Sequence, residues 1–318
     1  MLLSLATLII GLLLLVKGSD ILISCAISIG KKINVSEFFI GLIVVGFGTS
    51  LCELVVSIDA VIKGSPDISV GNVIGSNIAN LLLVLFAAGI TSELKGVKVS
   101  IFDLTFHFIS HFSFLIIFLF YFLDKNFGLF FIFFFLFYLL KSFQKSNAED
   151  IDEVSPENNF FSNLSFKNPF IFGIPIAIIS VIITLLGADI TVDSAINISK
   201  FLNISDSFIG LTIIAIGTSL PEIATSINAA KRGKSNIIIG NIIGSNIYNL
   251  LLILGFTSLF ESFSYDKNML STDVIFLNIA VILFTFIIFK RIKIGRNLSL
   301  ICFLIYCAYL AHLYIKNF

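Results

Sequence analysis

The sequence has little charge for its length. Asp, Glu, Lys and Arg make up only 13% of its 318 residues, against roughly 25% in soluble globular proteins. The 20 acidic and 20 basic side chains cancel, so no basic excess is available to build a face for nucleic acid. Hydrophobic residues account for 57% of the chain and Phe alone supplies 36, which is more apolar side chain than a soluble domain can bury. A soluble enzyme, a disordered chain and a nucleic-acid binder are therefore excluded, and a polytopic membrane protein remains.

Cysteines and targeting signals are also sparse. The four cysteines (Cys25, Cys52, Cys302 and Cys307) lie in apolar stretches, at spacings typical of neither a zinc site nor a disulfide framework. No positive charge precedes the first apolar run and no clear small-residue cleavage site follows it. A cleavable signal peptide is therefore not expected.

Apolar runs of membrane-spanning length recur along the chain. A membrane helix needs about 20 mostly apolar residues, and these runs do not alternate with the period of two that a β-barrel strand requires. We therefore predict an all-α fold with ten transmembrane helices. Their ranges are 2–30, 37–62, 68–91, 101–122, 127–143, 169–198, 206–230, 236–259, 270–289 and 297–315.

Lys and Arg are unevenly distributed over the loops. If the N-terminus lies outside, 14 of these 20 residues fall in inside segments, five fall in outside segments, and Lys17 lies within the first span. Because cytoplasmic loops are enriched in Lys and Arg, we expect both termini outside, in the plasma (inner) membrane. The segment 146–168, between the five spans of 1–145 and the five of 169–318, is then a cytoplasmic linker whose acidic residues are solvated.

The two halves of the chain repeat each other, and from residue 18 to residue 85 the offset is a constant 169 residues. Between 41–85 and 210–254, 24 of 45 positions are identical. Each half carries five predicted spans, and an odd number means that the second half enters the membrane from the opposite side. Inverted repeats with interrupted helices are a transporter design, in which the substrate site lies near the midplane between the repeats.

One glutamate stands roughly halfway along the second span and another halfway along the seventh. Glu53 follows the residues Gly-Thr-Ser-Leu-Cys and Glu222 follows Gly-Thr-Ser-Leu-Pro. A lone carboxylate at that depth is costly, so it should face a polar cavity or a cation. Glycine, and in the second copy proline, loosens the helix just before the glutamate, which frees backbone carbonyls and exposes the start of a half-helix.

Oxygen atoms dominate the other polar groups of these motifs. Carboxylate, hydroxyl, amide and carbonyl oxygens suit hard cations such as Ca²⁺ and Na⁺ rather than zinc or copper. Small and hydroxylated residues also serve as ordinary contacts between membrane helices, but two copies, each with a midplane glutamate, favour an ion site. The side chains concerned are Thr49, Ser50, Ser76, Asn77 and Asn80 in the first half and Thr218, Ser219, Ser245, Asn246 and Asn249 in the second.

The motifs GTSLCE and GTSLPE, each followed by GNxIGSNIxN, resemble the two alpha-repeats of the sodium/calcium exchanger family, in the calcium/cation antiporter superfamily. The resemblance covers nearly the whole chain. It implies a ten-helix antiporter, not an enzyme, that exchanges Ca²⁺ for Na⁺ by alternating access, needs no cofactor and is expected to work as a monomer in the lipid bilayer. It implies that Glu53 and Glu222 are the central cation ligands. The implied completing ligands are Thr49, Ser50, Ser76, Asn80, Thr218, Ser219, Ser245 and Asn249, with the carbonyls of Gly46 and Ala215.

Two positions depart from the pattern of that family. Cys52 stands where the motif usually has proline, so the first broken helix must rely on Gly46 and Gly48 for its irregularity. We interpret Cys52 itself as a tolerated small residue. Asn249 stands where many prokaryotic and potassium-dependent relatives have aspartate; it matches Asn80 and removes one acid. No potassium requirement is therefore expected.

A polar stripe in the fourth span has two interpretations. Asp103, His107 and His111 are spaced by four residues and share one face of a helix. The stripe can serve as polar contact with neighbouring helices, which we favour. A proton-sensitive or metal-binding stripe is the alternative.

Two further acids and two serines stand at equivalent positions of the halves. Asp20 and Asp189 lie in long helices; Asp20 can pair with Lys17 one turn away, and a gating or ion-path role is the alternative. Ser36 and Ser205, just ahead of the second and seventh spans, are expected to be helix N-caps.

Three competing functions remain for a protein of this kind. Ca²⁺/H⁺ exchange differs only in whether the glutamates take up protons instead of sharing Na⁺, and the sequence does not distinguish them. A cation channel would use similar oxygens but would show downhill flux without a counter-ion gradient. A membrane enzyme is disfavoured, because neither a nucleophile–base set nor an aspartate-rich cluster stands near a membrane face.

Overall fold

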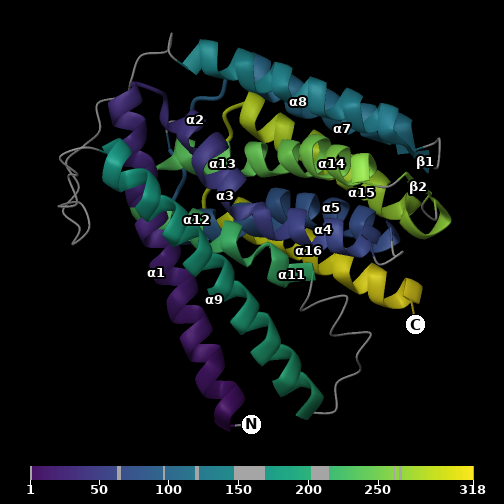
Figure 1. Ribbon diagram of the computed structural model, residues 1–318, viewed down its shortest axis with the longest axis horizontal. Coiled ribbons are helices and arrows are strands. Elements are labelled where there is room, and N and C mark those ends of the chain that lie inside the picture. Colours follow the sequence, from purple (N-terminus) through teal and green to yellow (C-terminus); the bar gives the residue numbers. More distant parts are fainter. Residues whose placement is uncertain are drawn as a thin grey trace.

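The computed structural model is a bundle of helices with two strands of two residues each (Figure 1). It describes residues 2–62, 66–95, 97–118, 122–146, 169–201, 215–260, 262–264 and 267–317. The first half contains α1 (Leu2–Ile33), α2 (Glu37–Ile40), the π-helix η1 (Gly41–Gly46), α3 (Phe47–Thr49), α4 (Leu51–Ile62), α5 (Pro66–Ala79), the π-helix η2 (Asn80–Val84), α6 (Leu85–Thr91), α7 (Ile101–Phe118), β1 (Phe122–Leu123) and α8 (Lys125–Ser146). The second half contains the π-helix η3 (Pro169–Gly173), α9 (Ile174–Phe201), α11 (Ala215–Thr218), α12 (Leu220–Lys231), α13 (Ser235–Ile247), the π-helix η5 (Tyr248–Ile253), α14 (Leu254–Phe260), β2 (Phe263–Ser264), α15 (Lys267–Phe289) and α16 (Arg296–Asn317).

Most of the predicted membrane spans are present as long apolar helices. In the described part of the chain, eight helices are long and apolar enough to cross a membrane, and a ninth span results if 37–49 and 53–62, which meet at 47°, are counted together. The predicted seventh span, 206–230, lies partly outside the described residues. The predicted fourth span, 101–122, is too long, because Phe122 belongs to β1; the described part of this span is α7, Ile101–Phe118.

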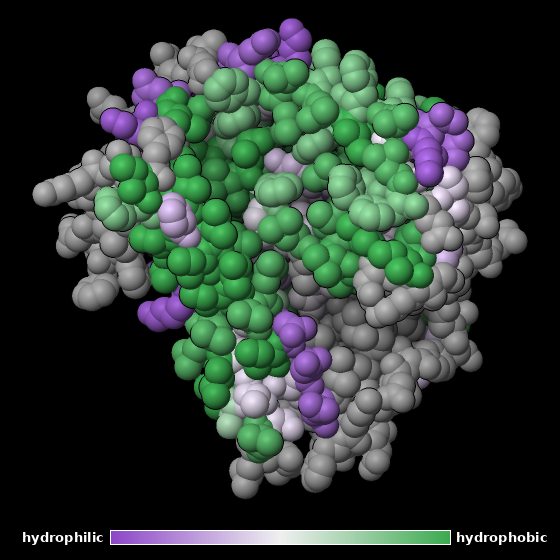
Figure 2. All heavy atoms as spheres, in the orientation of Figure 1, coloured by the Kyte–Doolittle hydropathy of each residue, from purple (hydrophilic) through white to green (hydrophobic). Residues whose placement is uncertain are grey.

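The outer surface is apolar, as a bilayer requires. Hydrophobic residues cover most of the coloured face in Figure 2, and hydrophilic residues gather in a few small groups. Phe133 of α8 is 70% exposed and Leu304 of α16 is 65% exposed. Apolar patches of this extent are rare on soluble monomers, so the structure supports the interpretation as a polytopic membrane protein.

Helices α1 and α9 form a closely packed pair that runs obliquely to the other long helices (Figure 1). A Cβ atom added to Gly187 would lie 2.4 Å from the backbone nitrogen of Leu15, and one added to Gly11 would lie 2.8 Å from that of Thr191. Small residues at a membrane helix interface let two backbones approach in this way. The pair is therefore packed backbone to backbone.

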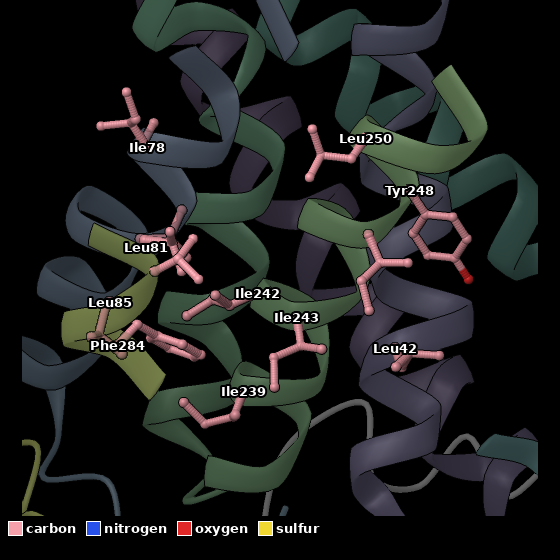
Figure 3. Packing of buried hydrophobic residues seen from close by; sticks show 14 of the residues in the cluster. Leu42, Ile78, Leu81, Leu85, Ile239, Ile242, Ile243, Tyr248, Leu250 and Phe284 are labelled. Carbon is pink, nitrogen blue, oxygen red and sulfur yellow. The ribbon is translucent and has the colours of Figure 1, made fainter. Parts of the chain in front are cut away.

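Helix α13 lies at the centre of the bundle. In Figure 3 its residues Ile239, Ile242 and Ile243 lie between Leu81 on one side and Leu42 on the other. A Cβ on Gly240 would lie 2.1 Å from the carbonyl oxygen of Phe38, so only glycine allows this approach of α13 to the start of the second span.

A Cβ added to Gly244 of α13 would similarly lie 2.7 Å from the carbonyl oxygen of Leu42. Its equivalent in the first half is Gly75. No described atom lies within 4 Å of a Cβ added to Gly75. The residues equivalent to η1 in the second half, 210–215, lie almost entirely outside the described part.

Equivalent helices of the two halves share their bounds. Adding 169 to the bounds of α4 gives those of α12, and adding 169 to those of α6 gives those of α14. Two short backbone pairings join the halves: Leu94 pairs with Ile294, and β1 pairs with β2. Position 94 plus 169 is Phe263 of β2, so the two pairings involve nearly equivalent segments.

Candidate cation site

Each candidate glutamate stands in the first turn of a helix that begins at a break. Ser50 has φ −72° and ψ 1°, outside helical geometry, and Glu53 lies in the first turn of α4. Ser219 has φ −91° and ψ 3°, Pro221 occupies the start of α12, and Glu222 lies in its first turn. Proline is accommodated there because the first turn needs no intrahelical N–H donor. The unpaired N–H groups of a helix N-terminus favour negative charge, so the break places both carboxylates where the backbone supports them.

The two carboxylates are buried and close to each other. Glu53 is 0% exposed and Glu222 is 1% exposed, and they are near enough to interact electrostatically. Ser50 Oγ donates to Glu222 Oε1 at 3.5 Å, and Ser76 lies close to Glu53 without a hydrogen bond of normal geometry. Both oxygens of Glu53 and Oε2 of Glu222 have no hydrogen-bond partner among the described residues.

Hydroxyl and carbonyl oxygens from both halves surround these carboxylates. Ser76 Oγ lies 3.4 Å from Thr218 Oγ1. Ser245 Oγ donates to the carbonyl oxygen of Gly46 at 3.4 Å, and Thr49 Oγ1 donates to the same carbonyl at 3.3 Å. The contacts of Ser76 with Thr218 and of Ser245 with Gly46 join one half of the chain to the other, as the contact of Ser50 with Glu222 does.

The predicted asparagines lie at the π-helical segments. Asn80 is the first residue of η2 and Asn249 is the second residue of η5. Both are fully buried, and none of their side-chain nitrogen or oxygen atoms has a hydrogen-bond partner in the described part of the chain. Ser219 Oγ is likewise unpartnered. Of the buried unpartnered side-chain atoms in the described residues, more than half therefore belong to five predicted ligands, Glu53, Asn80, Ser219, Glu222 and Asn249.

An unpartnered buried polar atom needs a physical explanation, because its desolvation is otherwise uncompensated. Across the described residues no group of three or more His, Cys, Asp and Glu side chains is arranged to hold a metal ion, and neither Lys nor Arg forms an ion pair with Glu53 or Glu222. A cation held here would therefore take two carboxylates and otherwise neutral oxygens. That set fits a hard cation such as Ca²⁺ or Na⁺.

One predicted ligand, Ala215, and two other residues singled out in the sequence, Cys52 and Ser205, are described only in part or not at all. The backbone of Ala215 lies in α11, four residues before the break at Ser219, but its side chain lies outside the described part. The side chain of Cys52 also lies outside it. Ser205, one of the two predicted N-caps, lies outside the described residues. Ser36, the other, is confirmed as an N-cap, because its hydroxyl accepts from the backbone N–H of Phe39 at 3.3 Å.

Two asparagines that brace the site had no role in the sequence interpretation. Asn72 Nδ2 donates to Ser57 Oγ at 3.0 Å and to the carbonyl oxygen of Glu53 at 3.2 Å. The equivalent Asn241 Nδ2 donates to Ser226 Oγ at 3.1 Å. One signal in the sequence could have identified them: Asn72 and Asn241 stand at the same place in both motif copies, as the ligand serines do.

The polar stripe of α7 makes contacts with neighbouring helices, as favoured from the sequence. Asp103 Oδ1 accepts from Ser142 Oγ of α8 at 3.0 Å. His107 and His111 contact asparagines of α13 and α5. Asp20 was expected to pair locally with Lys17, but its partner is Arg232 at the end of α12, 2.5 Å away. The sequence could not show this pairing, because it depends on how α1 packs against α12.

Comparisons with known proteins extend over nearly the full chain. The model of the sodium/calcium exchanger protein family matches residues 3–144 and 172–315. The chain is 33% identical to the sodium/calcium exchanger MaX1 of Methanosarcina acetivorans, covering 88% of this chain and 90% of MaX1. It is 32% identical to the inner membrane protein YrbG of Escherichia coli, covering 99% and 98%. The solved structure of the sodium-calcium exchanger NCX_Mj soaked with Na⁺ and Sr²⁺ matches with a TM-score of 0.81 and 32% identity, covering 98% of both chains.

Proposed function

The chain belongs to the sodium/calcium exchanger family, and from that premise we propose that it exchanges Ca²⁺ for Na⁺ across the membrane by alternating access. Family membership makes it a multi-pass membrane antiporter of cations, with transporters rather than enzymes as relatives. The identity of the exchanged pair, the ligands and the topology are the content of the proposal.

The observation that carries the proposal is the pair of buried carboxylates with unpartnered oxygens. Burying a charged group without a partner costs several kcal/mol even after relaxation. Two carboxylates at one place balance one divalent ion or two monovalent ions that share the same oxygens, and each further monovalent ion adds a net positive charge. A site returned across the membrane without ions would carry both charges uncompensated, which disfavours the unloaded transition and makes exchange obligatory.

We assign Glu53 and Glu222 as the central ligands, contacted by the cations in both loaded states. The completing oxygens come from Thr49, Ser50, Ser76, Asn80, Thr218, Ser219, Ser245 and Asn249 and from the backbone carbonyls of Gly46 and Ala215. The contacts between Ser50 and Glu222 and between Ser245 and Gly46 support this set, because they bring both motif copies to one place.

The proposed architecture has ten spans in two inverted repeats, 1–145 and 169–318, joined by the cytoplasmic linker 146–168, with both termini outside. The common bounds of α4 and α12, and the two nearly equivalent pairings at β1–β2 and at Leu94–Ile294, support an internal two-fold relation. The bent pair 37–49 and 53–62 counts as the second span.

Alternating access is assigned to the pair α1 and α9, which would slide across the remaining helices. Their contact with the core includes polar groups: Arg232 binds Asp20, and Asn228 Nδ2 donates to Ser19 Oγ at 2.7 Å. These contacts, here named the α1 latch (Ser19, Asp20 and Ser24 with Asn228 and Arg232), lie at the end of α12 that the charge distribution places inside. Asp189, the equivalent of Asp20 on α9, is exposed.

We favour Na⁺ over H⁺ as the counter-ion because the proposed site is rich in neutral oxygens. Hydroxyls, amides and carbonyls ligate Na⁺ but do not take up protons near neutral pH. Only Glu53 and Glu222 among the assigned ligands can be protonated. Ca²⁺/H⁺ exchange remains the second candidate, since protonation of those two would also balance the site. With Asn249 in place of an acid, no potassium dependence is proposed.

The test is Ca²⁺ uptake into proteoliposomes loaded with Na⁺. Glu53→Gln and Glu222→Gln should each reduce uptake by more than about 30-fold, because removing one buried charged ligand typically costs 2 kcal/mol or more. Glu93→Gln, which changes a glutamate outside the spans that pairs with Lys95, is the matched control and should leave uptake unchanged. Near-normal uptake in either site variant would refute the ligand assignment.

A further inference from the structure

Two buried histidines of α7 contact both copies of the Gly-Ser-Asn motif. His107 and His111 have no exposed surface, and their ring centroids are 4.4 Å apart. His111 Nε2 lies 3.2 Å from Asn77 Nδ2, and His107 Nε2 lies 3.5 Å from Asn246 Nδ2. Each asparagine directly follows a proposed ligand serine in the sequence. The histidines therefore act on the chain next to the ion site in both halves.

The two asparagines also bind each other. Asn77 Nδ2 donates to the carbonyl oxygen of Asn246 at 3.2 Å, and Asn246 Nδ2 donates to the carbonyl oxygen of Asn77 at 3.5 Å. The residues are equivalent at the 169 offset, so this reciprocal pair joins α5 to α13 where the halves meet. Each amide nitrogen has two protons. One goes to the other half and one goes to a histidine.

The ring of His111 is oriented to accept. Its Nδ1 lies 2.7 Å from the carbonyl oxygen of His107, so Nδ1 carries the proton and Nε2 has a lone pair. That lone pair faces the amide nitrogen of Asn77, not its oxygen. Both amide oxygens, Asn77 Oδ1 and Asn246 Oδ1, are buried and have no donor among the described residues. His111 thus holds the amide of Asn77 in one of its two possible orientations, and Nε2 of His107 faces the equivalent amide nitrogen of Asn246.

The histidine pair belongs to one half only. The second half contains one histidine, His312 of α16, and α15 contains none. One pair of histidines therefore serves both motif copies, and the pair is an addition to the repeated motif.

We propose that His107 and His111 are positioning residues for the ion site. By accepting the amide protons of Asn77 and Asn246, they fix α5 against α13 and hence hold Ser76 and Ser245 in place as ligands. The inference rests on the proposed function, because it assigns the histidines to that same site. In this role the histidines do not contact the ions. Their loss loosens the ligand serines, which weakens cation binding, and it leaves the turnover rate largely intact.

The test compares an apolar with an accepting replacement in the proteoliposome assay. His111→Leu should raise the KM for Ca²⁺ about 10-fold, since a buried N–H loses its acceptor, with a maximal rate within about 2-fold of wild type. His111→Gln supplies an amide oxygen as acceptor and should raise the KM less than about 3-fold. His312→Leu, at an exposed position of α16, is the matched control and should have no effect. Equal effects of Leu and Gln at position 111, or none, would overturn the positioning role.

A second readout separates this inference from the proposed function. Ca²⁺ binding to the detergent-solubilised protein, followed as a Ca²⁺-dependent rise in unfolding temperature, needs no transport. If the wild type transports and binds but His111→Leu binds equally well, only the positioning role fails. If the wild type binds Ca²⁺ without Na⁺-driven transport and His111→Leu binds more weakly, the positioning role stands and the proposed exchange fails. If the wild type neither binds nor transports Ca²⁺, both fail. Should His111→Leu not fold, Asn77→Ala removes the same hydrogen bond and must raise the KM in the same direction.

Discussion

Breaking the α1 latch should change which face of the protein binds Ca²⁺ more tightly. Arg232 Nη2 donates to the carbonyl oxygen of Asp20 at 3.0 Å, to Asp20 Oδ1 at 2.5 Å and to Ser24 Oγ at 2.9 Å. These bonds exist only while α1 is docked against the end of α12. The substitution Arg232→Ala removes all three, and it acts on the docked conformation alone.

The magnitude follows from the exposure of the two charges. The side chain of Arg232 is 4% exposed and that of Asp20 is 26% exposed, so solvent screens the pair only partly. A hydrogen bond to a charged group contributes about 1.5–3 kcal/mol, and screening on the Asp20 side reduces the total. About 2 kcal/mol for the whole contact is a reasonable value, which corresponds to a shift of roughly 30-fold in the equilibrium between docked and undocked states.

The KM for Ca²⁺ is measured separately at each face of the protein, in vesicles that hold it in one orientation or the other. A ligand's apparent affinity scales with the fraction of protein in the competent state. The KM for Ca²⁺ at the face where Arg232 lies should therefore fall by up to about 30-fold, while the KM at the opposite face stays constant or rises. Lys231→Ala, at an exposed neighbouring position, is the control and should change neither. Equal changes at both faces would refute the role of the latch.

Three further outcomes are expected. Exchange by the wild type should be insensitive to K⁺, because Asn249 removes one acid; a K⁺-stimulated Ca²⁺ flux would contradict this. Gly240→Ala should lower the unfolding temperature by an amount equivalent to roughly 1–3 kcal/mol, because the new Cβ would lie 2.1 Å from the carbonyl oxygen of Phe38; an unchanged melting curve would contradict that packing. The backbone N–H of Phe127, which donates to Asp124 at the start of α8, holds the pKa of Asp124 below its usual 3.8, so the carboxylate stabilises the folded state at neutral pH and ceases to as pH falls through the lowered pKa. Asp124→Ala should thus lower the unfolding temperature at pH 7 and differ progressively less from wild type below pH 3.8; a difference that persists in acid would contradict the capping role.

The sequence was most informative where chemistry and local backbone rules coincide. Glycine and proline before Glu53 and Glu222 predicted the helix breaks, and the breaks are found at Ser50 and Ser219. The position of Ser36 before an apolar run predicted an N-cap, which is confirmed. These features depend on residues within a few positions of one another, so a single sequence contains the information.

Contacts between distant segments could not be read in the same way. The pairing of Asp20 with Arg232 joins residues 212 positions apart. Sequence spacing alone indicated only the local pairing of Asp20 with Lys17. The histidines were recognised as one helical face, but their contacts with Asn77 and Asn246 require the packing of α7 against α5 and α13. The spacing along a helix shows which residues share a face, but it does not show which residues of other helices that face contacts.

The central claim is tested most directly by the counter-ion gradient that drives Ca²⁺ uptake. Purified wild-type protein in proteoliposomes is given external Ca²⁺ and, in separate preparations, an outward gradient of Na⁺, of K⁺ or of H⁺, with the other two ions equal on both sides. The account predicts Ca²⁺ accumulation with the Na⁺ gradient alone. Accumulation driven by the H⁺ gradient and indifferent to Na⁺ would contradict it.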